Sequence, residues 1–208
     1  ARNILGTPEK VRSFKRKQIQ HFIQKNYHTH EMVICSVGKI NPKKFETLIT
    51  RYFENLPENN TEHNRLHFSG YIPQSKEITK DTFQSHCVIG AEAYNITHDL
   101  RLPMILLNNI IGGSSMNSRL NMALRERNGL AYNVESNYSP YTDTGVFMTY
   151  FGTERNNLFR AVDLVEKEFQ ILRAKKLGPQ QLARSKKQMI GQLAIANENR
   201  EDLMLTIG

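Results

Sequence analysis

A stretch without hydrophobic periodicity divides this chain and limits what it can fold into. Residues 55–78 are crowded with prolines, asparagines and serines, and their apolar positions follow neither a helical nor a strand period. The segments on either side are strongly patterned. We therefore predict a helix–strand–helix segment over residues 1–54, a linker over 55–78 and a second folded segment over 79–208.

The first segment contains the same helix N-capping pattern twice. Thr7-Pro8 and Asn41-Pro42 each place a capping side chain before a proline at the first helical position. Apolar residues at helical spacing then predict amphipathic helices, one with Ile19, Phe22 and Ile23 on a face and one that runs through Phe53. Between these helices, the apolar run 32–37 predicts a short strand covered on at least one side.

The second segment begins with a strand and two helices. Residues 83–93 carry a strand-like apolar run, and Asp99 can cap a helix through Ile111 that is apolar on most sides and so predicted to be buried. A shorter helix follows over 117–127. Its inward residues are predicted to be Met116, Leu120 and Leu124, and Gly129 is predicted to end it.

A hairpin and two further helices complete the pattern. Residues 132–138 alternate along a predicted strand, and 146–151 form its partner after a turn. A long helix then begins at Leu158, and a last one begins after Gly178-Pro179. Hairpins and helices that do not alternate regularly indicate the α+β class, with an antiparallel sheet backed by helices. The helical pattern is still running at the chain end, so we expect this domain to be truncated there.

Composition narrows the classes of function. The 208 residues are 39% hydrophobic and 23% charged, which excludes disordered and collagen-like chains. The longest uncharged apolar stretch, around 104–111, is far too short to span a bilayer, so we expect no membrane partner. The net charge of +8 attracts nucleic acid non-specifically, but the basic run over 10–17 does not show the repeated aromatics of a single-strand-binding surface. We expect no nucleic-acid partner, and salt-sensitive binding of DNA or RNA is the test of that alternative.

The positions of the cysteines and histidines predict neither a metal site nor a disulfide framework. Cys35 and Cys87 each lie in an apolar, strand-like run and are predicted to be free thiols, which is compatible with a reducing compartment and favours the cytoplasm. His63 has zinc-ligand spacing to His67, beside Glu62, but these residues fall in the linker, where no helix would hold them on one face.

Two further histidines are also predicted not to bind metal. His28 and His30 lie in a helix-to-strand connection and are predicted to be surface groups. We therefore predict no metal ligand in this chain.

Three motifs occur in order in the second segment. They are Gly112–Leu120 (GGSSMNSRL), Leu124–Tyr132 (LRERNGLAY) and Tyr141–Phe147 (YTDTGVF). Together they resemble the C-terminal domain of the inverzincin metallopeptidases, the family of pitrilysin, insulin-degrading enzyme and mitochondrial processing peptidase. Residues 1–54 resemble the closing part of the preceding module of this family, so the resemblance covers nearly the whole chain.

This resemblance implies a function for the chain as one half of a larger protein. In active family members a His-x-x-Glu-His helix and a later Glu provide the zinc ligands and the catalytic base, and these belong to a segment upstream of this chain. Zinc is thus expected in the full-length protein and not in this chain. The chain would be the substrate-binding, non-metal half of a zinc-dependent peptidase, inactive alone.

The resemblance also implies partners. These are a peptide or protein substrate and either the upstream catalytic domain of the same polypeptide or a partner subunit, in a homo- or hetero-oligomer that the sequence leaves open. The alternative function is a non-catalytic scaffold or partner subunit of a processing-peptidase-like complex. A His-x-x-Glu-His motif upstream of Ala1 would favour the enzyme.

The family also implies two site residues. An Arg and a Tyr seven residues apart reach toward the substrate and the reaction centre in this family, and they match Arg125 and Tyr132. Physically, a helix ended by Gly129 can bring both side chains toward one edge, where the guanidinium can donate to peptide carbonyls and the phenol to a developing oxyanion. Arg127 is the alternative arginine, and the strand from Tyr132 could pair with a substrate backbone at a sheet edge.

Overall fold

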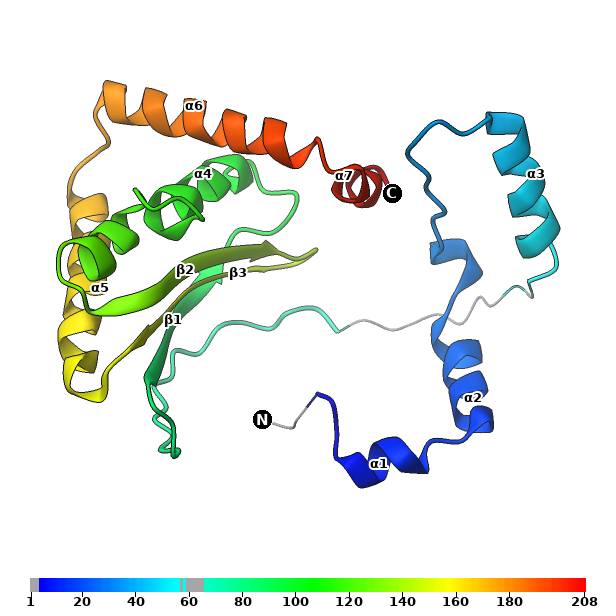
Figure 1. Ribbon diagram of the computed structural model, residues 1–208, viewed down its shortest axis with the longest axis horizontal. Coiled ribbons are helices and arrows are strands. Elements are labelled where there is room, and N and C mark those ends of the chain that lie inside the picture. The colour runs from blue at the N-terminus through cyan, green and yellow to red at the C-terminus, as the bar shows by residue number, and fades with distance from the viewer. Residues whose placement is uncertain (1–3, 57, 59–65) are drawn as a thin grey trace. The chain divides into compact units, whose positions relative to one another are not determined.

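The chain divides into two units. The computed structural model describes residues 4–56, 58 and 66–208, and Figure 1 shows its helices and strands. The first unit, here called the helical unit, comprises the described residues of Ala1–Arg65 together with Ala194–Gly208, and the second, the sheet unit, comprises Leu66–Leu193. Among the described residues, no helix combines the length and the apolar character needed to cross a membrane.

The helical unit is built from short helices with side-chain caps. Its elements are α1 (Pro8–Ser13), α2 (Arg16–Asn26), the 3₁₀ turn η1 (Thr29–Glu31), α3 (Pro42–Phe53) and α7 (Arg200–Ile207). Both predicted caps are present. Thr7 Oγ1 accepts the Lys10 amide at 3.4 Å, and Asn41 Oδ1 accepts the Lys43 amide at 3.0 Å. The prediction of an amphipathic helix that runs through Phe53 is confirmed.

Two predictions for this unit are wrong. Residues 32–37 form no strand, because no other strand pairs with them in the part of the chain that the structure describes. His28 is not a surface group. It is 3% exposed, its carbonyl accepts the Glu31 amide, and its ring lies 5.7 Å from that of His30. His30 is exposed, as predicted.

The sheet unit confirms the predicted α+β class. Strands β1 (Ser85–Ala93), β2 (Ala131–Pro140) and β3 (Gly145–Thr153) form an antiparallel sheet in the order β1-β3-β2. Strand β2 is thus an edge strand within the described residues. The helical elements are α4 (Arg101–Gly112), the π-helical segment η2 (Asn121–Glu126), the 3₁₀ turn η3 (Arg155–Asn157), α5 (Leu158–Ala174) and α6 (Pro179–Ala196), whose last residues belong to the helical unit.

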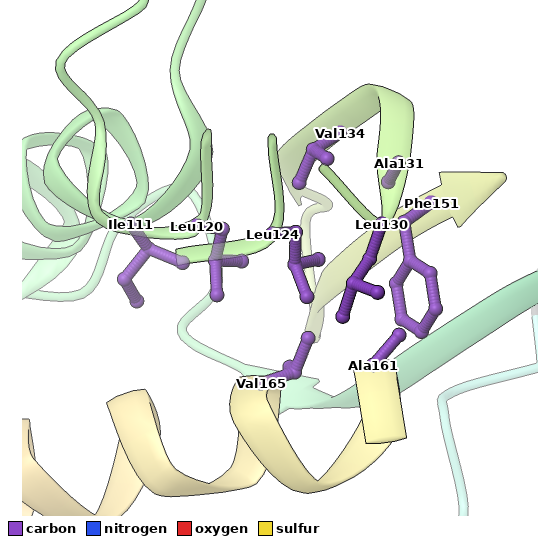
Figure 2. Packing of buried hydrophobic residues seen from close by; sticks show 9 residues of the cluster. All are labelled: Ile111, Leu120, Leu124, Leu130, Ala131, Val134, Phe151, Ala161 and Val165. Carbon is purple, nitrogen blue, oxygen red and sulfur yellow. The ribbon is translucent and has the colours of Figure 1, made fainter. Parts of the chain in front are cut away.

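One hydrophobic core holds the sheet unit together. Figure 2 shows Leu124 of η2, with Leu120 and Leu130 on either side of that segment in the chain, facing Ala161 and Val165 of α5, and Phe151 of β3 beside them. Phe151 lies opposite Val134 on β2 and opposite Cys87 on β1, so one face of the sheet contributes to the core. The predicted inward positions Leu120 and Leu124 are fully buried. Burying a side chain of this size contributes about 1.5–3 kcal/mol, which makes the core the main stabilising feature of this unit.

Three details of the sheet unit differ from the predictions. Met116 is 61% exposed, because it lies in the loop before η2 rather than on its inner face. Asp99 does not cap α4. The imidazole of His98 accepts the Leu100 amide at 3.0 Å instead. Helix α4 is only partly buried, with Ile111 and Gly112 as its buried residues, because it lies at the sheet edge.

The predicted linker is only partly described. The described residues of 55–78 carry neither helix nor strand. His67 is exposed, whereas Glu62 and His63 lie outside the described residues. The boundaries 1–54, 55–78 and 79–208 stay a prediction.

Candidate functional site: a cleft beside the edge strand

One cleft, with a volume of about 290 Å³, opens beside strand β2. Its walls come from the C-terminal end of α4 and the loop after it, from η2, and from β2 itself. The lining residues are Gly112, Gly113, Ser114, Met116, Asn121, Arg125, Tyr132, Asn133, Val134, Glu135 and Ser136. The cleft thus combines a backbone edge with a cation, a carboxylate, a phenol and an amide.

Gly112 sets the closeness of α4 to β2. A Cβ at this position would lie 2.7 Å from Ser136 Oγ and 2.8 Å from the Ser136 amide nitrogen. Only a glycine permits so close a backbone approach. The Ser136 hydroxyl then donates to the Asn108 carbonyl at 3.0 Å. Gly112 therefore fixes one wall of the cleft.

The π-helical segment orients Arg125. The Arg127 amide donates to the Met122 carbonyl at 3.1 Å, a five-residue step that adds one residue to the turn. Gly129 then ends the segment with a φ of 60°, in the left-handed region. The Leu130 amide donates back to the Leu124 carbonyl at 2.7 Å, so the chain turns directly from η2 into β2.

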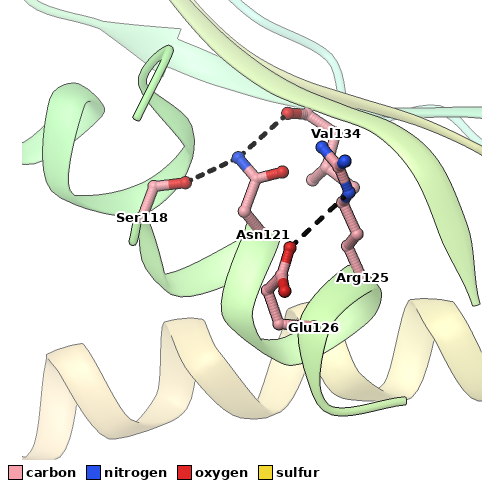
Figure 3. Close-up of polar contacts among 5 residues, drawn as sticks. All are labelled: Ser118, Asn121, Arg125, Glu126 and Val134. Carbon is pink, nitrogen blue, oxygen red and sulfur yellow. Dashed lines mark hydrogen bonds and ion pairs between the residues drawn. The ribbon is translucent and has the colours of Figure 1, made fainter. Parts of the chain in front are cut away.

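Asn121 joins η2 to the edge strand. It is 8% exposed, and its Nδ2 donates to Ser118 Oγ at 2.8 Å and to the Val134 carbonyl at 3.4 Å. Figure 3 shows these two bonds. Sequence reasoning missed this residue. The available signal was a polar side chain four residues before Arg125, on the same helical face, within an otherwise apolar pattern.

Arg125 lies in the cleft with a weak partner. Its Nε is 3.6 Å from Oε1 of Glu126, and the two side chains are 44% and 37% exposed. Figure 3 shows the guanidinium beside β2 at Val134. A solvent-exposed ion pair of this kind is worth about 0–1 kcal/mol. A ligand carbonyl or carboxylate can therefore replace Glu126 at little cost.

Tyr132 reaches the cleft because β2 contains a bulge. In a regular strand Tyr132 and Val134 would lie on the same face. The register shifts instead, since Ala131 lies opposite Thr153 and Val134 lies opposite Phe151. One extra residue on β2 re-aims the side chains, and Tyr132 is 85% exposed while Val134 is 5% exposed. The prediction that side chains alternate regularly between the two strand faces from residue 132 onward is therefore wrong for Tyr132 and Val134.

The structure brings Arg125 and Tyr132 to one cleft. They come from different elements, one from η2 and one from β2, and both line the same cavity. Arg127, the alternative arginine, is exposed but does not line it. The catalytic role of the pair stays a prediction, since the structure gives their placement alone.

The described residues do not fit a metal ion. Among them, no group of three or more His, Cys, Asp or Glu side chains converges on a point. Glu135 is the one carboxylate that lines the cleft in the part of the chain described, and a lone carboxylate is too few ligands for zinc.

Comparison with known proteins identifies the family. Residues 13–189 match the family described as the peptidase M16 inactive domain. The match places the chain among metallopeptidase domains. More particularly, the chain belongs to the peptidase M16 inactive-domain family, which confirms the resemblance that its motifs predicted. An inactive domain is consistent with a non-catalytic half of a larger protein.

The relatives and the fold agree with this family. The chain is 30% identical, over 97% of its length, to a Bacillus subtilis (strain 168) protein named uncharacterized zinc protease YmxG, of which it covers 48%. It is 29% identical, over 79% of its length, to the probable mitochondrial-processing peptidase subunit beta of Schizosaccharomyces pombe, of which it covers 38%.

A solved structure has the same fold. A peptidase M16 inactive domain from Pseudomonas fluorescens matches with a TM-score of 0.77 at 21% identity, over 89% of this chain and 45% of that chain. The chain thus spans about half the length or less of the proteins it resembles.

Proposed function

We propose that this chain is the substrate-binding, non-metal half of a zinc-dependent peptidase. The observation that carries the proposal is the meeting of Arg125 and Tyr132 in one cleft beside an edge strand. The names of two relatives as zinc proteases support the reaction class. Zinc would be held by residues outside this chain, where it would supply the activated water, and this chain alone would not hydrolyse peptides.

Three parts of the cleft would interact with a bound peptide in different ways. The unpaired side of β2 offers backbone donors and acceptors to an extended peptide, a sequence-tolerant way to bind. The Arg125 guanidinium would donate to substrate carbonyls once it exchanges its exposed partner Glu126. The Tyr132 hydroxyl would donate to the oxyanion that develops on the scissile carbonyl, in a site from which the peptide has excluded water.

The two residues should affect different kinetic constants of the full-length protein. Tyr132→Phe removes a donor that acts in the transition state and should lower kcat by about 10²–10³-fold with little change in KM. Arg125→Ala removes a charged donor that holds the bound peptide and should lower kcat/KM by about 10–100-fold, mainly through KM. The measurement is steady-state hydrolysis of a quenched fluorescent peptide, with thermal melting to verify folding.

Matched controls lie close by. Arg127→Ala removes an exposed arginine two residues away that does not line the cleft, and Tyr141→Phe removes the hydroxyl of a phenol that is 55% exposed in the β2–β3 turn. Both variants should keep kcat and KM within about twofold. Near-normal kinetics for Arg125→Ala and Tyr132→Phe would leave these two residues with structural roles only.

A non-catalytic scaffold or partner subunit is the second candidate. The name of the S. pombe relative as a subunit favours it. In that case the full-length protein would bind extended peptide through the same cleft without hydrolysing it. Peptide binding by fluorescence anisotropy, together with an absent His-x-x-Glu-His motif in the residues encoded upstream, would establish the scaffold and reject the enzyme.

A further inference from the structure

A polar side chain, that of Asn121, lies among apolar residues between η2 and β2. It is 8% exposed, and the nearby Leu120 and Leu124 are fully buried. Burying an amide is unfavourable unless its polar atoms form hydrogen bonds. The amide nitrogen of Asn121 forms two, to Ser118 Oγ at 2.8 Å and to the Val134 carbonyl at 3.4 Å. The burial is therefore compensated on the donor side of the amide.

The oxygen of the same amide is an unused acceptor. Asn121 Oδ1 accepts no hydrogen bond from the part of the chain that the structure describes. Within that part, the side-chain atoms that are fully buried without a hydrogen-bond partner are Asn108 Oδ1 and Thr149 Oγ1, so Asn121 Oδ1 retains accessible surface. Because Asn121 lines the cleft beside β2, this surface opens into the cleft.

The contacts of the amide nitrogen fix the direction of Oδ1. The Val134 carbonyl can only accept a hydrogen bond, so the nitrogen of Asn121 has to face it, whereas the Ser118 hydroxyl can bond to either atom of the amide. A flipped amide would place two oxygens against each other. Figure 3 shows Oδ1 on the side of the Arg125 guanidinium. A fixed acceptor thus lies next to a donor, and both come from η2.

We infer that Asn121 Oδ1 accepts a backbone N–H from the peptide whose carbonyl the Arg125 guanidinium holds. The main chain of a peptide presents N–H donors and C=O acceptors in turn, which matches this pair of side chains. The recognised feature is a secondary amide, so a peptide with proline at that position, which has no N–H, binds more weakly. The inference rests on the proposed function, since it places a peptide in the cleft.

The experiment measures binding of backbone-methylated peptides to the full-length protein. The parent is the tightest binder from a mixed-sequence peptide library, and each derivative is N-methylated at one backbone amide. Fluorescence anisotropy gives the Kd, and a chelator that removes zinc prevents hydrolysis. At one position, N-methylation should raise the Kd of the wild-type protein about 3–10-fold, the usual effect of one lost hydrogen bond. In Asn121→Leu, the same methyl group should change the Kd by less than about twofold.

Two further variants separate the acceptor from packing. Asn121→Asp keeps an oxygen acceptor but loses the donor to Val134, so it should lower the Tm and still distinguish the N-methylated peptide. Asn128 is the matched control. Its Nδ2 also donates to a backbone carbonyl, that of Ala123 at 2.8 Å, but its Oδ1 already accepts from Arg160 at 3.0 Å. Asn128→Leu should lower the Tm and leave the discrimination as in the wild-type protein.

The outcomes distinguish this inference from the proposed function. If Arg125→Ala weakens peptide binding but no N-methylated position depends on Asn121, the cleft binds peptide as proposed and the inference is overturned. Loss of the discrimination in Asn128→Leu would also overturn it, because packing around η2 would then be the cause. A full-length protein that binds no peptide of the library would overturn both.

Discussion

The helical unit and the sheet unit carry amphipathic helices of similar quality, and only the sheet unit buries them. On α5, Ala161 and Val165 are fully buried. On α2, at equivalent helical spacing, Phe22 remains 58% exposed. The difference arises from what each helix faces. Helix α5 meets η2 and the core side of the sheet, whereas α2 meets no comparable surface among the described residues.

This comparison separates the position of an apolar helix face, which a sequence pattern shows, from the free energy of burying that face, which the pattern does not show. Hydrophobic periodicity specifies where a helix forms and which face is apolar. The free energy of burial depends on a partner surface, which another part of the chain or another chain must supply. The sheet unit contains its partner surfaces, whereas none of the described helices α1, α2, α3 and α7 of the helical unit has a buried residue.

The largest expected effect is the removal of a core side chain. Phe151 is fully buried between the sheet and α5. Phe151→Ala should destabilise the sheet unit by about 3–5 kcal/mol, through lost burial and a residual cavity. Urea denaturation of the chain, followed by circular dichroism, measures the free energy of unfolding.

The matching variant in the helical unit tests the comparison directly. Phe22→Ala should change the unfolding free energy of this chain by less than about 0.5 kcal/mol, because the side chain is already largely in water. Similar costs for Phe151→Ala and Phe22→Ala in the isolated chain would show that the two units do not differ in burial.

A smaller effect is expected where α4 touches β2. Gly112→Ala places a methyl group against the Ser136 backbone and should cost about 1–3 kcal/mol, because neither element can move away without breaking the sheet edge. Since this contact forms a wall of the cleft, the variant should also weaken peptide binding. Thermal melting and peptide anisotropy measure the two effects.

Gly191 provides the control for this variant. It lies within α6, and a Cβ there would meet no atom within 4 Å. Gly191→Ala should therefore stabilise the chain by about 0.5–1 kcal/mol, through helix propensity alone. A Gly112→Ala variant that is equally stabilised would mean that α4 and β2 are further apart than the structure has them.

The sequence predicts the elements of the sheet unit well, because local signals specify them. The turn over 140–145 and the stop at Gly129 each use residues whose backbone preferences allow few alternatives. The hairpin pairs Val134 with Phe151, and the predicted inward leucines, Leu120 and Leu124, are buried. These signals act within a few residues and need no knowledge of the rest of the fold.

The geometry of the cleft depends on contacts that no local pattern specifies. The β-bulge that exposes Tyr132 arises from the register between two strands. The π-helical turn before Arg127 and the buried bonds of Asn121 likewise result from packing against β2. The resemblance to the metallopeptidase family therefore located the pair of residues, Arg125 and Tyr132, but not the backbone irregularities that orient them.

The smallest effect concerns the two thiols, one in each unit. Both were predicted to be free, and both are free and half-buried. Cys87 lies on β1 opposite Phe151, and its burial there raises the pKa of its thiol above the ordinary value. In a Cys35→Ser variant, alkylation of Cys87 by iodoacetamide should thus be several-fold slower in the folded chain than in urea. The pH midpoint of Cys87 alkylation should also be higher in the folded chain than in urea.

The sign of the linked stability follows from the same shift. Because the folded state favours the protonated thiol, this contribution to stability is complete below the pKa of the unfolded thiol. It is lost as the pH rises from there through the higher folded pKa. A Cys87→Ser variant should lose this alkaline dependence, while Cys35→Ser retains it. A midpoint for Cys87 equal to that in urea would mean that β1 does not shield its core face, and the contrast between the two units would then be weaker than their burial indicates.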